Sequence, residues 1–224
     1  MKYEDWKWAD YFYSDTYDEE FANGTLRNLY GLHDPDDLRE WEYQDTSLRA
    51  AEIIRDPRLI TRTYDAAHLK SIHAYLFQDV YEWAGRYRTV DMSKGNSFFF
   101  VKEIDKWLDE ANGMIRGFDW PDLSHDDFAE ACANVFARVN QAHPFREGNG
   151  RASKVFMEHV SELSHFRLNW GQIPAEEWNS CFDVSSMALS QHYPEGAIEA
   201  LAPLFWDAAR PRGGPGSAID IESI

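Results

Sequence analysis

Long apolar runs, cysteine and positive charge are all scarce in this sequence of 224 residues. No apolar stretch approaches the ~20 residues of a membrane-spanning helix, and the N-terminal residues are not those of a signal peptide, so we expect a cytoplasmic protein. Two cysteines, Cys132 and Cys181, are too few for a disulfide framework or a cysteine zinc site, which predicts reduced thiols. Lys and Arg number 22 against 39 Asp and Glu, and this formal charge of −17 disfavours general binding to nucleic acid or to an anionic membrane.

Hydrophobic and aromatic residues are plentiful, at 44% and 15% of the chain, so a substantial core can form. Helical periodicity dominates and predicts helices near 25–30, 34–56, 64–80, 103–116, 124–142, 150–163, 174–190 and 195–209. The segment 86–101 differs, because strand-forming residues at 87–90 and 98–101 flank a turn-like composition at 93–97. This pattern favours a short β-hairpin, with an ordinary connector as the alternative.

The domain organisation expected from these patterns is simple. Residues 1–206 form a single all-α domain with a small hairpin, and no internal repeat or second boundary is visible. A loop-like composition at 211–217 predicts a flexible C-terminal tail over 207–224.

The most informative stretch is 143–154, which reads HPFREGNGRASK. Its histidine can accept a proton near neutral pH, and its carboxylate, Glu147, can hold a magnesium ion. The glycines lie where a helix begins, so free N–H groups there suit phosphate oxygens. Arg151 and Lys154 are three residues apart, hence on one helix face, and both cations point to a polyphosphate. Singly these residues are common in loops and turns; their joint occurrence predicts transfer of a phosphate-containing group.

This stretch resembles the signature of the Fic (Fic/Doc) family, His-x-Phe-x-Asp/Glu-Gly-Asn-Gly-Arg-x-x-Arg, at every defined position but the last. Segments 64–69 and 77–88 are similar to the family's lead into its hairpin flap, and 23–32 is similar to the opening of Fic AMP-transferases. The resemblance spans roughly residues 20–206 and implies the Fic-type helical bundle.

The resemblance implies transfer of AMP from ATP to a Tyr, Ser or Thr hydroxyl of a target protein. His143 would be the base, Glu147 would hold Mg²⁺, and Phe145 would anchor the loop. The candidate nucleotide-binding residues are Arg146, Gly148, Asn149, Gly150, Arg151, Ala152 and Lys154, with the glycines and Asn149 as an anion cradle. The hairpin residues Lys94, Gly95, Asn96, Ser97, Phe98, Phe99 and Phe100 would form the flap that aligns the target by strand pairing.

Lys154 departs from the family, which has arginine there to meet the γ-phosphate. Lysine keeps the charge but loses the planar fork, so a weaker hold on the γ-phosphate or a different donor stays open. Many family members also carry an inhibitory Ser/Thr-x-x-x-Glu-Gly/Asn helix, and neither Thr16…Glu20 nor Gln191…Glu195 matches it. This favours a toxin that a separate small antitoxin inhibits, and resemblance to bacterial Fic toxins suggests ATPase subunits of type II topoisomerases as targets.

Three alternatives remain at this stage. A Doc-like protein kinase uses the same pocket with ATP reversed, but its glycine cradle is degraded, whereas Gly148 and Gly150 are intact here. A transferase with another nucleotide-linked donor is kept open by Lys154. A binding module without activity predicts loss of His143 or Glu147, and neither is lost.

Overall fold

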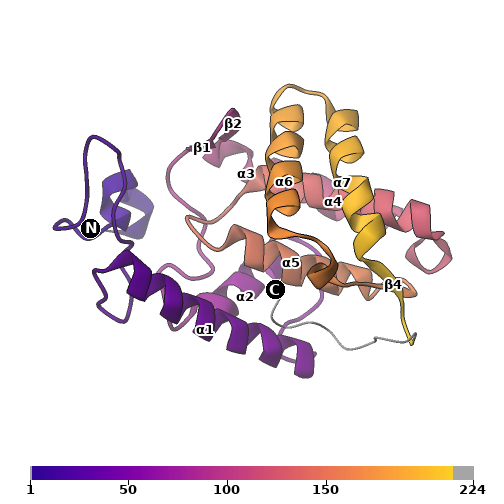
Figure 1. The fold of residues 1–224 in the computed structure, drawn as a ribbon, viewed down its shortest axis with the longest axis horizontal. Helices are drawn as coiled ribbons and strands as arrows, with labels where there is room; N and C mark the ends of the chain where they lie inside the picture. The colour runs from indigo at the N-terminus through magenta and orange to yellow at the C-terminus, as the bar shows by residue number, and fades with distance from the viewer. Residues whose placement is uncertain (1, 214–224) are drawn as a thin grey trace.

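The computed structural model describes residues 2–213, apart from the side chain of residue 175. The expected fold class is confirmed, because the described chain is mostly helical with two small sheets (Figure 1). Its helices are α1 (Pro35–Arg55), α2 (Ala66–Phe77), α3 (Ile104–Gly117), α4 (His125–Ala142), α5 (Asn149–Ser161), α6 (Ala175–Ser190) and α7 (Pro194–Ala208). Its strands are β1 (Met92–Lys94), β2 (Ser97–Phe99), β3 (Phe166–Leu168) and β4 (Ala209–Pro211).

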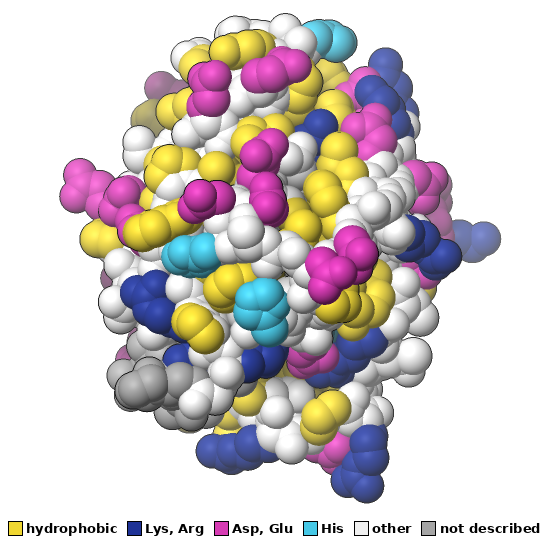
Figure 2. Space-filling model, turned by 90° about the vertical axis from the view of Figure 1, so that its right-hand side faces the viewer, with side chains coloured by type: hydrophobic (Ala, Val, Ile, Leu, Met, Phe, Trp, Pro, Cys, Tyr) yellow, Lys and Arg dark blue, Asp and Glu magenta, His cyan; other side chains and the backbone are white. Residues whose placement is uncertain are grey.

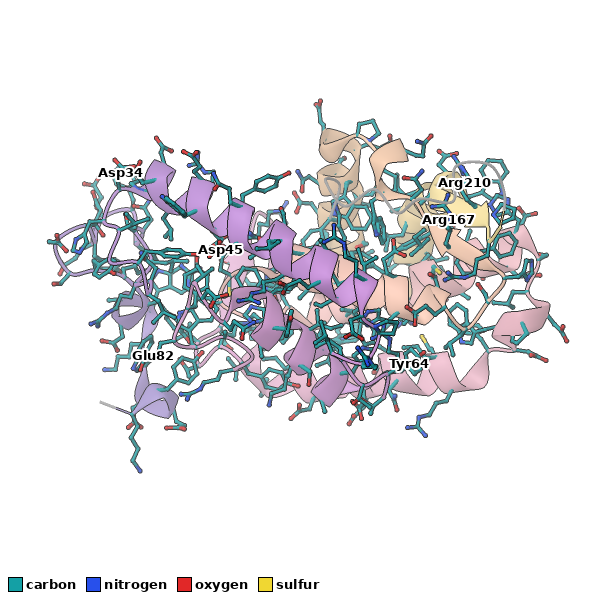
Figure 3. All side chains as sticks on the ribbon, turned by 90° about the horizontal axis from the view of Figure 1, so that it is seen from below. Asp34, Asp45, Tyr64, Glu82, Arg167 and Arg210 are labelled. Carbon is teal, nitrogen blue, oxygen red and sulfur yellow. The ribbon has the colours of Figure 1, made fainter. Side chains whose placement is uncertain are left out.

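Side-chain caps begin the helices where the sequence predicts them. The carboxylate of Asp34, which Figure 3 labels, accepts hydrogen bonds from the N–H groups of Asp36 and Asp37 at the start of α1. Ser124 Oγ likewise accepts from the Asp127 N–H at the start of α4. Because these caps satisfy N–H groups that have no helical partner, they fix the first turns of both helices.

Helix α4 lies behind α6 and α7 in the view of Figure 1 and packs against α3, α5, α6 and α7. Nearly every residue from Phe128 to Ala142 is buried, including the free thiol of Cys132. A helix that is buried on all sides is held by packing on every face. It therefore gives a rigid support for the loop that follows it.

The two small sheets lie at different places. Strands β1 and β2 form an antiparallel hairpin in which Lys94 pairs with Ser97, and β2 contacts α6. Strand β3 pairs with β4, so that Arg167 and Arg210 lie opposite one another, as labelled in Figure 3. The tail expected from residue 207 is therefore wrong for its first residues, since 207–208 end α7 and 209–211 form a strand. Residues 214–224 of that tail lie outside the described residues.

Two sequence expectations need correction in the first half of the chain. The helix at 25–30 is absent, because this segment pairs with other parts of the backbone: the Arg27 N–H donates to the Tyr11 carbonyl (2.8 Å) and the Leu29 N–H to the Val80 carbonyl (2.8 Å). Six residues are too few to nucleate a helix against such competition. The first hairpin strand lies at Met92–Lys94 rather than 87–90, because the turn is only Gly95 and Asn96.

The segment before α1 packs its aromatic side chains onto the base of the hairpin. Tyr3 Oη donates to the Tyr87 carbonyl (2.9 Å). Tyr11 is fully buried, and its Oη lies 3.0 Å from Thr89 Oγ1. These contacts fix the chain just before the hairpin. In the part of the chain that the structure describes, no helix has the length and apolar character needed to cross a membrane.

Acidic side chains spread over the upper part of the face shown in Figure 2, and Lys and Arg lie mostly in its lower half and along its right side. This pattern agrees with the formal charge of −17. A phosphate-binding site in such a protein therefore needs cations placed close to it.

Candidate active site

The loop between α4 and α5 has an unusual backbone at both ends. His143 takes the left-handed conformation (φ 38°, ψ 57°), and so does Gly148 (φ 78°). Asn149 closes the loop between them: its Oδ1 accepts from the Phe145 N–H (2.9 Å) and its Nδ2 donates to the Phe145 carbonyl (2.8 Å). The side chain of Asn149 thus shapes the loop.

His73 of α2 supports this loop from below. Its ring stacks on that of Phe145, with centroids 3.8 Å apart, and its Nε2 donates to the Glu147 carbonyl (3.0 Å). Its Nδ1 accepts from the Gly85 N–H (2.9 Å), which fixes the neutral tautomer. Burial lowers the pKa of His73 to about 3, so the ring stays neutral and the support persists at physiological pH.

Arg88 ties the loop to the base of the hairpin. Its guanidinium donates to the carbonyls of His143 (2.8 Å), Ala142 (3.3 Å) and Val90 (2.7 Å), and its own N–H donates to the Pro144 carbonyl (2.8 Å). The side chain is 1% exposed. A cation at the C-terminal end of α4 meets carbonyls that have no helical partner, which favours this position.

The imidazole of His143 lies between two aromatic rings. The Phe99 ring stacks on it with centroids 4.6 Å apart, and Phe182 approaches edge-on at 5.9 Å. Burial, with a smaller contribution from the charge of Arg88, lowers the pKa of His143 to about 3. The ring is therefore neutral near pH 7, and because its Nδ1 is buried, Nε2 is the nitrogen open to a substrate.

Gly148 and Gly150 have different reasons to be glycine. A Cβ at Gly148 would lie 2.2 Å from the Phe77 ring, and the residue has a positive φ, so a side chain is excluded on both grounds. A Cβ at Gly150 would meet nothing within 4 Å. The first helical bond of α5 runs from Ala152 to Gly148, so the N–H groups of residues 149–151 precede it and point out of the helix end.

A cavity of about 400 Å³ opens beside this helix end. Its lining comes from the hairpin, the loop and α6: Met92, Ser93, Lys94, Phe99, His143, Arg146, Glu147, Asn149, Gly150, Trp178, Asn179 and Phe182. The structure thus brings together the histidine, the carboxylate, the helix N-terminus and part of the hairpin. Part of the cavity lining is aromatic. Cations and the backbone N–H groups at the start of α5 belong to the same lining.

Four of the residues predicted to bind the nucleotide lie outside this lining. One of them is Gly148, which faces the Phe77 ring. Ala152 is fully buried in the core. Arg151 turns toward α1, where it forms an ion pair with Glu42 and donates to Thr46 Oγ1 (3.1 Å). Lys154 lies 5.8 Å from the Trp170 ring and 5.7 Å from the Trp178 ring, and burial lowers its pKa.

Glu147 is the acidic side chain of the loop, and its carboxylate is 46% exposed. Its Oε1 accepts from the Gly148 N–H (2.8 Å) and lies 3.9 Å from the Arg151 guanidinium. Among the described residues, no group of three or more His, Cys, Asp or Glu side chains is placed to hold a metal ion. A single carboxylate at a phosphate cradle fits Mg²⁺, which takes its remaining ligands from phosphates and water.

The hairpin presents different side chains to its two faces. Phe99 is buried against His143, whereas Phe98 and Phe100 are 52% and 41% exposed. Gln141 Nε2 donates to the Phe98 carbonyl (2.9 Å), and Lys94 pairs with Asp183 of α6 (3.1 Å). These contacts fasten the hairpin over the site while its outer aromatic residues face solvent.

Two groups of site residues do not follow from motif reasoning. Arg88 stands in a segment that resembles the family, but its spacing gives no sign that it reaches the carbonyl of His143. Trp178 and Phe182 lie four residues apart on a helical pattern, which indicates a core face, and they line the cavity as well. Only their position across from the loop reveals this second role.

Comparisons with known proteins place this site in a family. The model of the Fic/DOC family matches residues 63–161. The chain is 31% identical over 188 residues to the Salmonella typhimurium protein named "Probable protein adenylyltransferase Fic", covering 82% of this chain and 86% of that one. Among solved structures, the BepC protein from Bartonella tribocorum with bound AMPPNP is 27% identical, with a TM-score of 0.74 over 91% of this chain and 97% of that one.

A Fic domain from Bartonella quintana with bound ADP is also similar, with 26% identity and a TM-score of 0.75 over 91% of this chain and 96% of that one. The matched residues 63–161 include α2, the hairpin, α4 and α5, and therefore the whole of the loop that carries His143. The resemblance noted in the sequence is confirmed: the chain belongs to the Fic/DOC family.

Proposed function

We propose that this chain is a protein adenylyltransferase that transfers AMP from ATP to a hydroxyl side chain of a target protein. The observation that carries the proposal is the cavity in which His143, Glu147 and the N-terminus of α5 meet. Family membership supports the same activity, as do the relatives named protein adenylyltransferases and the similar structures with bound AMPPNP and ADP.

In the proposed reaction, the target oxygen attacks the α-phosphorus and the bond to the β-phosphate oxygen breaks, releasing pyrophosphate. His143 Nε2 accepts the proton of the hydroxyl, and burial keeps the ring neutral and therefore free to accept it. The N–H groups of residues 149–151 stabilise the negative charge on the α-phosphate. Phosphoryl transfer depends chiefly on positioning and electrostatics, and Arg88 and Asn149 hold the loop for both.

Mg²⁺ is the cofactor that these residues suit, and Glu147 is the residue that would hold it beside the phosphates of the donor. When bound, Mg²⁺ neutralises charge on the phosphate oxygens. The half-exposed carboxylate at the edge of the cavity supports this assignment. Trp178 and Phe182 offer flat apolar surfaces in the same cavity, which suit a nucleotide base.

The hairpin is the element proposed to dock the target. Its residues 94–100 join the cavity to an exposed pair of rings, Phe98 and Phe100, whose centroids are 6.4 Å apart. An exposed β-edge can pair with an extended peptide, and neighbouring apolar rings can add affinity. The acceptor hydroxyl would then face His143.

The regulation and the target also belong to this proposal. A separate antitoxin that carries the inhibitory helix is expected, because neither Thr16…Glu20 nor Gln191…Glu195 fits the inhibitory motif. Type II topoisomerase ATPase subunits are the target class suggested by the resemblance. Both remain predictions that co-purification and target identification can check.

The test supplies purified protein, Mg²⁺ and a cell lysate with ATP labelled at the α- or the γ-phosphate. Label on a protein band from α-labelled ATP only, lost in His143→Ala, supports AMP transfer. Label from γ-labelled ATP only identifies a kinase and contradicts the proposal. His125→Ala is the matched control, since His125 lies at the first turn of α4, at the end remote from the loop.

A further inference from the structure

Two cations line the cavity among the residues that the structure describes, Lys94 and Arg146. Lys94 is paired with the Asp183 carboxylate at 3.1 Å, and both side chains are 53% exposed. Arg151, the motif arginine, is engaged with Glu42 and Thr46 on α1. Arg146 is therefore the first candidate to supply the positive charge that a polyphosphate needs in this cavity.

Arg146 is buried without a polar partner. It is 9% exposed, its Nε is buried without an acceptor, and no hydrogen bond or ion pair to it is found in the described part of the chain. Its guanidinium instead lies over aromatic rings of the N-terminal segment: 4.1 Å from the Trp8 centroid, 5.0 Å from Phe12 and 5.8 Å from Tyr11. Arg146 also lines the cavity, so its free donors lie next to the substrate space.

A buried cation that no anion contacts is unfavourable in the empty protein: burial lowers the pKa of Arg146, and the charge of Glu147 offsets this only in part. Stacking on aromatic rings recovers only part of the lost hydration. The guanidinium donors other than the buried Nε, held in one plane by neighbouring rings, are however ready to bind an oxyanion. The arrangement makes sense if an anion completes it during the reaction.

We propose that Arg146 is the residue that binds the polyphosphate of the donor nucleotide, held in place by Trp8, Tyr11 and Phe12. This inference rests on the proposed function and deepens it, because the family motif leaves the position of Arg146 undefined. The donor is favoured over an acidic group of the target because Arg146 shares its cavity with Glu147 and the N-terminus of α5. The aromatic N-terminal segment thereby becomes a support of the nucleotide site.

Calorimetric titration of the full chain with ATP, and separately with adenosine, tests the proposal. Arg146→Met is expected to weaken ATP binding about 10- to 100-fold, the range for a lost charge-assisted contact, and to leave adenosine binding unchanged. Arg146→Lys, which keeps the charge but not the plane, should lie between. Arg39→Met removes the same charge from an arginine that is 75% exposed on α1 and should bind ATP like the wild type.

Thermal melting without nucleotide separates this role from a structural one. Because Arg146→Met removes an unpaired buried charge, its melting temperature should equal or exceed that of the wild type, and ATP should raise it less. A structural arginine predicts a clear drop instead. Trp8→Leu provides a second route, since removing the supporting ring should weaken ATP binding while Arg146 is still present.

Unchanged ATP affinity in Arg146→Met and Trp8→Leu overturns the proposal. If, with ATP affinity intact, Arg146→Met transfers AMP with a raised KM for the target, the anion belongs to the target. The proposed function fails in a different way: wild-type protein then binds ATP but transfers no label from its α-phosphate.

Discussion

Arg88 and Arg146 are both buried beside the active-site loop, but their guanidinium groups have different surroundings. Arg88 donates to three backbone carbonyls, those of Val90, Ala142 and His143. Among the described residues, the Arg146 guanidinium contacts aromatic rings and no hydrogen-bond acceptor. A side chain with satisfied donors holds a structure, whereas one with free donors is available to a ligand. The same residue type therefore serves positioning in one place and recognition in the other.

The pH dependence of AMP transfer follows from the environment of His143. Its pKa in the folded protein is lowered to about 3, so the ring stays unprotonated, and able to act as a base, well below the usual histidine value of about 6.5. We expect the acid limb of the kcat/KM profile, which reports the free enzyme, to lie below pH 6. Initial rates between pH 5 and 8, with circular dichroism as a check on folding, measure this. A midpoint near 6.5 would contradict it.

At the scale of elements, the start of α5 is the feature on which the site depends. Gly148 lets the chain turn against the Phe77 ring, and the helix then begins with N–H groups that face the cavity. Of the two glycines in the motif, Gly148 is therefore needed for folding, whereas Gly150 is needed for binding.

Paired alanine variants test this separation. Gly148→Ala should lower the free energy of unfolding by about 2 kcal/mol or more, because overpacking and a left-handed backbone both oppose the new Cβ. Gly150→Ala should leave it within about 0.5 kcal/mol, as for an uncrowded surface change, while weakening ATP binding where the methyl blocks a close phosphate. Urea unfolding and ATP titration of both variants measure the two effects. Equal losses of stability would refute the distinction.

The sequence predicts most elements and the site, but not how distant segments meet. Caps and breakers such as Asp34 and Ser124 act locally, so α1 and α4 are found within a residue or two. The segment 25–30 fails because its partners, around residues 11 and 80, are remote in sequence. Strand β4 fails for the same reason, since it exists through pairing with β3. Likewise, the motif identifies His143 and Glu147. The place of Trp178 in the cavity and the aromatic rings that support Arg146 depend on tertiary packing.

At the scale of the whole molecule, buried histidines make the stability of the core depend on pH. The rings of His68 on α2 and His159 on α5 are nearly parallel, with centroids 5.1 Å apart, and share a hydrogen bond of 2.9 Å. The Tyr64 N–H donates to His68 Nδ1, so His68 Nε2 is the donor to His159 Nδ1. This arrangement requires both rings to be neutral, and burial lowers their pKa values to about 4 and about 2.

Stability should therefore fall as the pH is lowered. Each of these histidines has a folded pKa below its unfolded value of about 6.5, so the unfolded state takes up protons first, and each contributes a loss of about 1.4 kcal/mol per pH unit below that value. The loss for His68 continues to about pH 4. Urea unfolding at pH 7, 6 and 5 measures it.

Glu158 acts in the opposite direction and serves as an internal comparison. Burial raises the pKa of its carboxyl to about 8, so its contribution is present at low pH and is lost as the pH rises toward 8. Glu158→Gln should raise the stability relative to the wild type at pH 8 and steepen the fall toward pH 5. A stability that is flat from pH 7 to 5 in the wild type would contradict the assignment of neutral, buried histidines.

The alternation of Phe98, Phe99 and Phe100 in the hairpin has a consequence for how such an enzyme changes its targets. The inward ring is held by its contact with His143, and Arg88 fastens the strand base to the same loop. The outward rings are exposed to solvent instead. If the hairpin docks the target as proposed, substitutions on its outward face can accumulate, or be grafted from another family member, without disturbing the chemistry beneath. New specificities could then evolve on a catalytic centre that stays constant.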